Sequence, residues 1–251
     1  MKTEPRMSIN QLMEYISEPL PSRRREMVDH QKNPLANKPI ITWCVSARKA
    51  IVAYLNSNCT DESLLDNEIE SLREKIENLV EKDPKKLESK TKKLEVEIEA
   101  INSFKGIQKE MNLKGLRFSK APKSKYLDYS GVHISVRPEV AVSNEKSWEY
   151  VGCVKLYFKK TKRLSEDGAN FLCSVLNQYA EKCLSPNRSA NPQACIAIDV
   201  FGHRTFTASK SVPLYTGKIH KSCQEIRGTW KEIPNRKEIN GDEDGQNDLF
   251  E

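Results

Sequence analysis

The sequence predicts an α+β protein with N-terminal helices, an antiparallel coiled-coil hairpin and a C-terminal ββαββα domain whose helices lie on one face of a small sheet. Three observations indicate this class: apolar stripes at helical spacing near the N-terminus, two heptad seams after them, and alternating apolar residues of strand type in the second half. The expected organisation is a basic helical segment at 1–60, the hairpin at 61–112, the α+β domain at 113–233 and an acidic disordered tail at 234–251.

Three helices are expected in the basic segment. Ser8 suits the N-cap of the first, Pro21 suits the first turn of the second, and 41–56 forms the third. The second helix presents three consecutive arginines, Arg23, Arg24 and Arg25. Such a cluster either forms a solvated helix face or contacts a phosphate backbone without reading its sequence.

Residues 61–112 carry two heptad seams. The first places apolar residues alternately four and three positions apart, at Leu65, Ile69, Leu72, Ile76 and Leu79. Pro84 then breaks the helix, and the second seam follows at Leu87, Leu94, Ile98 and Ile101. Two such arms predict an antiparallel hairpin, which acts either as a spacer or as a docking surface for a protein partner or a second copy.

Strands and helices alternate in the C-terminal domain. The strand candidates are 131–137, 149–159, 194–201 and 204–208, and the helices are about 165–184 and 216–231. Each helix has one apolar stripe, so both are expected to cover the same apolar face of the sheet. Gly202 and His203 predict a two-residue type II′ turn between the last two strands, with His203 at its exposed tip.

Side chains alternate across a strand, so the aliphatic side of the sheet leaves a second, mixed side. That side combines cations with aromatic rings, which suits phosphate contact and base stacking on single-stranded nucleic acid. The alternative is that helices cover this side and that Asp199 forms an ion pair with Lys155 beneath them. Together with the arginine cluster, the predicted nucleic-acid-binding residues are Arg23, Arg24, Arg25, Arg137, Lys155, Tyr157, Lys159 and Lys160.

The charge distribution favours a polyanionic partner. Residues 113–237 carry 22 Lys and Arg against 10 Asp and Glu, a basic excess of the kind that nucleic-acid-binding surfaces show. The sequence contains neither an apolar run of membrane-spanning length nor the apolar block of a secretory signal, so we expect a cytoplasmic protein without a membrane span. The seven cysteines, including Cys223 three residues after His220, are expected to be buried apolar residues rather than metal ligands or nucleophiles.

The order helix, three strands, helix, strand resembles the restriction-endonuclease-like nuclease fold. The resemblance implies carboxylates that hold a divalent metal, supplied by an acid and a later Glu-x-Lys, and a lysine that assists the attacking water. Lys155 is present, but Cys153 stands where the second acid would be. The candidate catalytic set is then Asp199, Lys155 and Glu149, with Glu139 as a further acid.

These patterns favour a non-enzymatic accessory protein without a cofactor, which contacts nucleic acid through a basic surface and a protein partner through the hairpin. One alternative is a divalent-metal nuclease that uses Mg²⁺ or Mn²⁺. The other is a pure assembly adaptor whose basic surface matches an acidic protein. These functions differ in what they need from the mixed side of the sheet, which must be open for bases to stack on it.

Overall fold

The computed structural model describes residues 4–34, 44–109, 111, 115–122, 126–186, 188–208 and 211–235. The chain forms two compact units. The first comprises Met1–Pro39, Lys125–Val136 and Leu214–Glu251, and the second comprises Ile40–Ser124 and Arg137–Pro213. This division differs from the four consecutive segments that the sequence predicts, because a segment from the middle of the chain joins both termini in the first unit. The expected acidic tail, from residue 236 onward, lies outside the described residues.

The first unit is built on a small three-stranded sheet. Its elements are β1 (Arg6–Ser8), α1 (Ile9–Ser17), α2 (Pro21–Lys32), β3 (Tyr126–Tyr129), β4 (Val132–Ser135) and most of α7 (Val212–Glu232). The strand order is β1-β4-β3, with β1 parallel to β4 and β3 antiparallel to it. Ser8 caps α1 as expected, because its hydroxyl accepts a hydrogen bond from the backbone N–H of Gln11.

The second unit is built on a five-stranded mixed sheet. Its helices and turns are α3 (Val45–Asn56), α4 (Ser63–Glu77), α5 (Pro84–Gln108), α6 (Glu166–Tyr179), the π-helical turn η1 (Ala180–Leu184) and the 3-10 turn η2 (Pro192–Ala194). Its strands are β2 (Leu116–Lys120), β5 (Val140–Asn144), β6 (Tyr150–Tyr157), β7 (Cys195–Asp199) and β8 (Arg204–Thr207), in the order β2-β5-β6-β7-β8. Only β6 and β7 are parallel, and α6 provides the crossover that such a pair requires.

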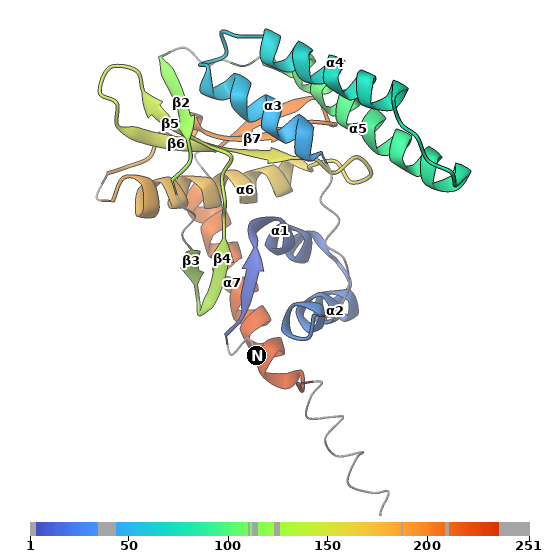
Figure 1. Ribbon diagram of the computed structural model, residues 1–251. Helices are drawn as coiled ribbons and strands as arrows, with labels where there is room; N and C mark the ends of the chain where they lie inside the picture. Colours follow the sequence, from blue (N-terminus) through green and yellow to red (C-terminus); the bar gives the residue numbers. More distant parts are fainter. Residues whose placement is uncertain are drawn as a thin grey trace, which may run out of the picture. The chain divides into compact units, whose positions relative to one another are not determined.

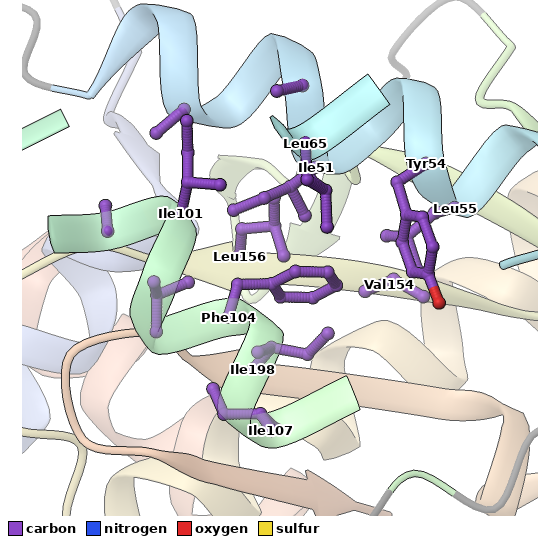
Figure 2. Close-up of a cluster of buried hydrophobic side chains, with 14 of the residues drawn as sticks. Ile51, Tyr54, Leu55, Leu65, Ile101, Phe104, Ile107, Val154, Leu156 and Ile198 are labelled. Carbon is purple, nitrogen blue, oxygen red and sulfur yellow. The ribbon is translucent and has the colours of Figure 1, made fainter. Parts of the chain in front are cut away.

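Helices cover both faces of this sheet (Figure 1). Val154 and Leu156 of β6 pack with residues such as Phe104 of α5 on one face (Figure 2). On the other face, the thiol of Cys153 donates a 3.7 Å hydrogen bond to the carbonyl of Leu176 in α6. The prediction that both C-terminal helices share one face is therefore wrong. The mixed α and β content is confirmed, but α6 lies opposite α3 and α5, and α7 belongs mostly to the first unit.

The two long helices of the predicted hairpin run antiparallel. Lys105 near the end of α5 pairs with Asp66 near the start of α4 at 2.5 Å. Asp83 caps α5 by accepting the backbone N–H of Lys85, and Pro84 occupies the first turn. The buried face of α5 is wider than a heptad seam, because its second half packs on the sheet as well as on α4. Its buried apolar residues are Ala100, Ile101, Phe104 and Ile107.

The backbones of β6 and η2 approach each other closely at Gly152 and Ala194. A Cβ atom at Gly152 of β6 would lie 2.1 Å from the carbonyl oxygen of Ala194, which is closer than any real contact. Only glycine therefore allows η2 to pack against β6.

We expect Gly152→Ala to lower the free energy of unfolding by about 1–3 kcal/mol, because the added methyl group displaces backbone. Gly106→Ala in α5 is the matched control, since a Cβ there meets only ordinary contacts. In that control, the helix preference of alanine should raise stability by about 0.5–1 kcal/mol. Urea denaturation of both variants followed by circular dichroism measures the two effects, and equal stabilities would contradict the close-packing argument.

Candidate functional site at the carboxyl end of strand β6

The mixed side of the sheet is covered rather than open. Lys155 and Tyr157 of β6 are each 5% exposed, and Asp199 at the end of β7 is 0% exposed. The helix α6 packs against this side through its contact with Cys153. Bases therefore cannot stack on this face of the sheet.

Lys155 forms its ion pair with Glu139, not with Asp199. Its ammonium nitrogen lies 2.9 Å from Oε1 of Glu139 and 2.8 Å from the carbonyl oxygen of Arg137. The predicted pair of Asp199 with Lys155 is wrong for a reason of register: β6 and β7 align Lys155 with Ala197, and Tyr157 with Asp199. Asp199 therefore lies two residues beyond Ala197, the residue of β7 that faces Lys155.

Both oxygens of Glu139 are occupied. Oε1 also accepts a 3.2 Å hydrogen bond from Arg48 of α3, and Oε2 accepts one of 2.9 Å from the backbone N–H of Leu156. A nearly buried carboxylate that binds two cations and a backbone donor holds α3, β5 and β6 together. The guanidinium of Arg48 also lies over the Phe158 ring, 5.2 Å from its centroid.

Asp199 organises the backbone at the end of β7. Its Oδ2 accepts the backbone N–H of Leu164 at 2.8 Å, and its Oδ1 accepts that of Gly202 at 3.0 Å. The connection to β8 has four residues, from Val200 to His203, and its left-handed residue is His203, with φ of 53°. The predicted hairpin exists, but its connection is not a type II′ turn, because the positive φ belongs to His203 and not to Gly202. Glycine at 202 leaves room for the Asp199 carboxylate, which would lie 2.1 Å from a Cβ there.

The residues between β6 and Leu164 form a cationic loop. We call Phe158 to Arg163 the basic loop; it carries four cations and no acid, at Lys159, Lys160, Lys162 and Arg163. Lys159 is half-buried, whereas the other three are exposed. Lys160 pairs with Glu99 of α5 and lies 5.9 Å from the centroid of the Phe201 ring.

The basic loop continues directly from β6 at its N-terminal end, and buried groups fix its C-terminal end. The Tyr157 hydroxyl donates a 2.9 Å hydrogen bond to the carbonyl of Lys162. Just beyond the loop, Leu164 donates its N–H to Asp199 and accepts a 2.5 Å hydrogen bond from Arg204 of β8. Tyr157 and Asp199 thus anchor a cationic surface instead of forming one, and Arg48 and Arg204, which are both partly exposed, flank it.

Sequence reasoning missed half of the cations in the basic loop, Lys162 and Arg163, and the flanking Arg48 and Arg204. The signal for the loop was present: four cations in six residues, between the end of a strand and the helix cap Ser165. Arg48 and Arg204 lie far from the basic loop in the sequence, and the fold brings Arg48 over the Phe158 ring and Arg204 to the carbonyl of Leu164.

The other predicted cations have different surroundings. In the first unit, Arg24 pairs with Glu225 at 3.2 Å and Arg25 with Glu232 at 2.8 Å, so these two arginines join α2 to α7. Arg23 is exposed on α2. Arg137 is exposed in the second unit, where its φ of 46° is unusual for a residue other than glycine.

The residues proposed for the nuclease do not form a metal site. Glu149 pairs with Arg188, Lys155 with Glu139, and Asp199 with backbone N–H groups. Within the described part of the chain, no three His, Cys, Asp or Glu residues gather closely enough to hold a metal ion. Mg²⁺ or Mn²⁺ therefore does not fit the residues around Lys155.

The cysteines behave largely as expected from the sequence. Five are buried and two, Cys59 and Cys183, are half-buried. Burial raises the pKa of the Cys223 thiol to about 12, which disfavours the reactive thiolate. The His220 ring nitrogen Nδ1 lies 3.1 Å from the hydroxyl of Ser130, so this nitrogen contacts Ser130 and not the thiol of Cys223.

Comparison with protein-family models finds no match, and comparison with curated proteins finds no significant one. Among the described residues, no helix has both the length and the apolar character needed to span a membrane.

We expect Tyr157→Phe to loosen the basic loop, because it removes the hydrogen bond to the Lys162 carbonyl. Trypsin should then cleave the native protein faster within 159–163, while the free energy of unfolding falls by about 0.5–1.5 kcal/mol. Timed digestion with mass spectrometry measures the cleavage. Tyr150→Phe, a half-buried position at the other end of β6, is the control; similar digestion of both variants would contradict this role of Tyr157.

Proposed function

We propose that this protein is a non-enzymatic accessory protein that binds nucleic acid through the basic loop and the flanking Arg48 and Arg204. The observation that carries the proposal is the basic loop itself, which holds four cations without an acid, continues from β6 and is fixed at its C-terminal end by the buried groups Tyr157 and Asp199. This surface replaces the open sheet face that the sequence suggested.

Anchoring the loop matters for binding. Cations on a fixed backbone lose less conformational freedom when they meet phosphates than cations on a flexible loop would lose. Lysine and arginine contacts to phosphates position a protein on nucleic acid without reading its sequence. We therefore expect binding that depends strongly on salt and weakly on base sequence.

The nearby acids are already engaged. Glu139 is almost fully buried and bound by Lys155 and Arg48, and Glu99 pairs with Lys160 at the surface. Asp199 is fully buried, accepts two backbone N–H groups and lies 3.9 Å from the guanidinium of Arg204. The surface potential around the basic loop is therefore expected to be positive.

We expect the fourfold variant Lys159→Ala, Lys160→Ala, Lys162→Ala and Arg163→Ala to bind both DNA and RNA much more weakly. On duplex DNA, each lost phosphate contact lowers the slope of log K against log salt by about 0.9, so the slope should fall by about two or more. Fluorescence anisotropy of labelled oligonucleotides across a salt series measures both quantities.

The matched control removes four exposed lysines from the helical hairpin, at Lys82, Lys85, Lys86 and Lys92. This control has the same change in net charge, so it should keep most of the binding and of the salt slope. Equal losses in the two fourfold variants would show that overall charge, not the basic loop, carries the interaction. Wild-type protein that binds no nucleic acid even at low salt would sink the proposal.

We also propose that the hairpin contacts a protein partner or a second copy of the chain. A groove of about 590 Å³ runs beside the turn between α4 and α5, where Leu79 and Leu94 contribute apolar lining and Val80 is 91% exposed. Deleting 62–111 would remove core residues such as Phe104, so Val80→Asp is the cleaner variant for testing this contact. Under the adaptor alternative, Val80→Asp would lose binding to the protein partner. The fourfold basic-loop variant would then bind nucleic acid no more weakly than the wild-type protein does.

The nuclease alternative has weaker support. The order α5, β2, β5, β6, α6, β7 keeps the succession that resembles a restriction-endonuclease-like fold, with a β-hairpin inserted. A shared fold does not specify a reaction, however, and the Glu139 oxygens are already bound. Cleavage that requires Mg²⁺ or Mn²⁺ and disappears in Glu139→Gln would favour the nuclease over our proposal.

A further inference from the structure

A second surface feature lies at the opposite end of β6 from the basic loop. Trp148, in the turn between β5 and β6, is 67% exposed, although tryptophan carries the largest apolar side chain. Its φ of 59° places it in the left-handed region, which costs energy for any residue with a Cβ. A bulky side chain that faces solvent from a strained backbone position adds nothing to the buried core, so it points to function.

The turn fixes this conformation. The N–H of Trp148 donates a 2.9 Å hydrogen bond to the carbonyl of Asn144, and the N–H of Asn144 donates one of 2.9 Å to the carbonyl of Glu149. The Asn144 side-chain oxygen also accepts the N–H groups of Lys146 and Ser147, at 2.8 and 3.3 Å. The backbone that carries the indole is therefore held in place before any ligand arrives.

One face of the indole is already covered. The guanidinium of Arg117, on the edge strand β2, lies 4.1 Å from the centroid of the Trp148 ring. With Arg117 on one face, an exposure of 67% leaves the opposite face to solvent. The result is a flat aromatic surface with a positive charge behind it.

We propose that the open face of Trp148 is a stacking platform for an unpaired nucleobase, and that Arg117 behind the ring attracts the phosphates of the same strand. This inference rests on the proposed nucleic-acid binding and adds a preference for single strands. Every base has a flat π-face, so stacking tolerates any sequence, whereas bases inside a duplex are already stacked on each other. Arginine suits the position because its planar guanidinium packs on an aromatic ring and also binds phosphate.

The local charges agree with this ligand. Arg117 lies on β2, and the turn itself adds the exposed cation Lys146 and the exposed acid Glu145. Glu149 is paired with Arg188 and adds little free negative charge. A single-stranded segment therefore meets a weakly cationic platform here, whereas the stronger phosphate attraction comes from the basic loop.

The test separates stacking from charge. Anisotropy measures the binding of dT and U oligomers and of abasic oligomers that have the same length and backbone charge. Wild-type protein should bind the base-bearing oligomers about tenfold more tightly than the abasic ones. Trp148→Ala should remove this preference while leaving the affinity for abasic oligomers unchanged. The dT and U arms show whether DNA, RNA or both supply the base.

Two further variants keep the test decisive. Trp148→Gly removes the ring and fits the left-handed backbone without strain, so it should lose the preference even if the alanine variant folds poorly. Tyr126→Ala, which removes another exposed aromatic ring from the first unit, is the control and should keep the preference.

The outcomes distinguish the two proposals. Trp148 is not a stacking platform if Trp148→Gly retains the tenfold preference. The same holds if this variant loses as much affinity for abasic oligomers as for base-bearing ones. In both cases, the proposed binding through the basic loop still stands. If the wild-type protein binds no oligomer, both proposals fail. Partial preference in Trp148→Phe would further support stacking, because a smaller ring gives a smaller contact.

Discussion

The second unit depends on how the buried carboxylate of Asp199 is satisfied. A charge that is fully removed from solvent must find hydrogen bonds, and Asp199 finds two backbone N–H groups on different segments, those of Leu164 and Gly202. One side chain thus joins the end of β7, the turn into β8 and the segment that leads into α6. The basic loop owes its position to this connection and to the hydroxyl of Tyr157.

The sequence allowed many local elements to be predicted, because local rules determine them. Ser8 caps α1, Pro84 begins α5, and the last two strands form a hairpin. The positions of the helices on the two faces of the sheet were harder to predict, because alternation along a strand shows which residues share a side but not which helix covers that side. The apolar stripe of α7 looked equivalent to that of α6, yet the two helices serve different units.

The same limit explains the candidate site. Lys155, Tyr157 and Asp199 could be recognised as polar residues within apolar strands, but a polar residue on a covered face becomes an anchor rather than a ligand contact. The partner of Lys155 could not be predicted from its own strand, because Glu139 lies in a different segment, immediately before β5. Trp148 could not be predicted as a site residue, because the hydrophobic pattern of a sequence shows neither the exposure of a side chain nor the strain of its backbone.

The interleaving of the two units has a consequence for the order of folding during synthesis. All strands of the second unit have been made once β8 is complete, so that unit can close while the ribosome is still extending the chain. The first unit must wait: β1, made at the outset, pairs with β4 from the middle of the chain, and α7 follows β8. Until α7 emerges from the ribosome, α2 lacks the helix to which Arg24 and Arg25 bind. The first unit is therefore the part of the chain that we expect chaperones to bind during synthesis.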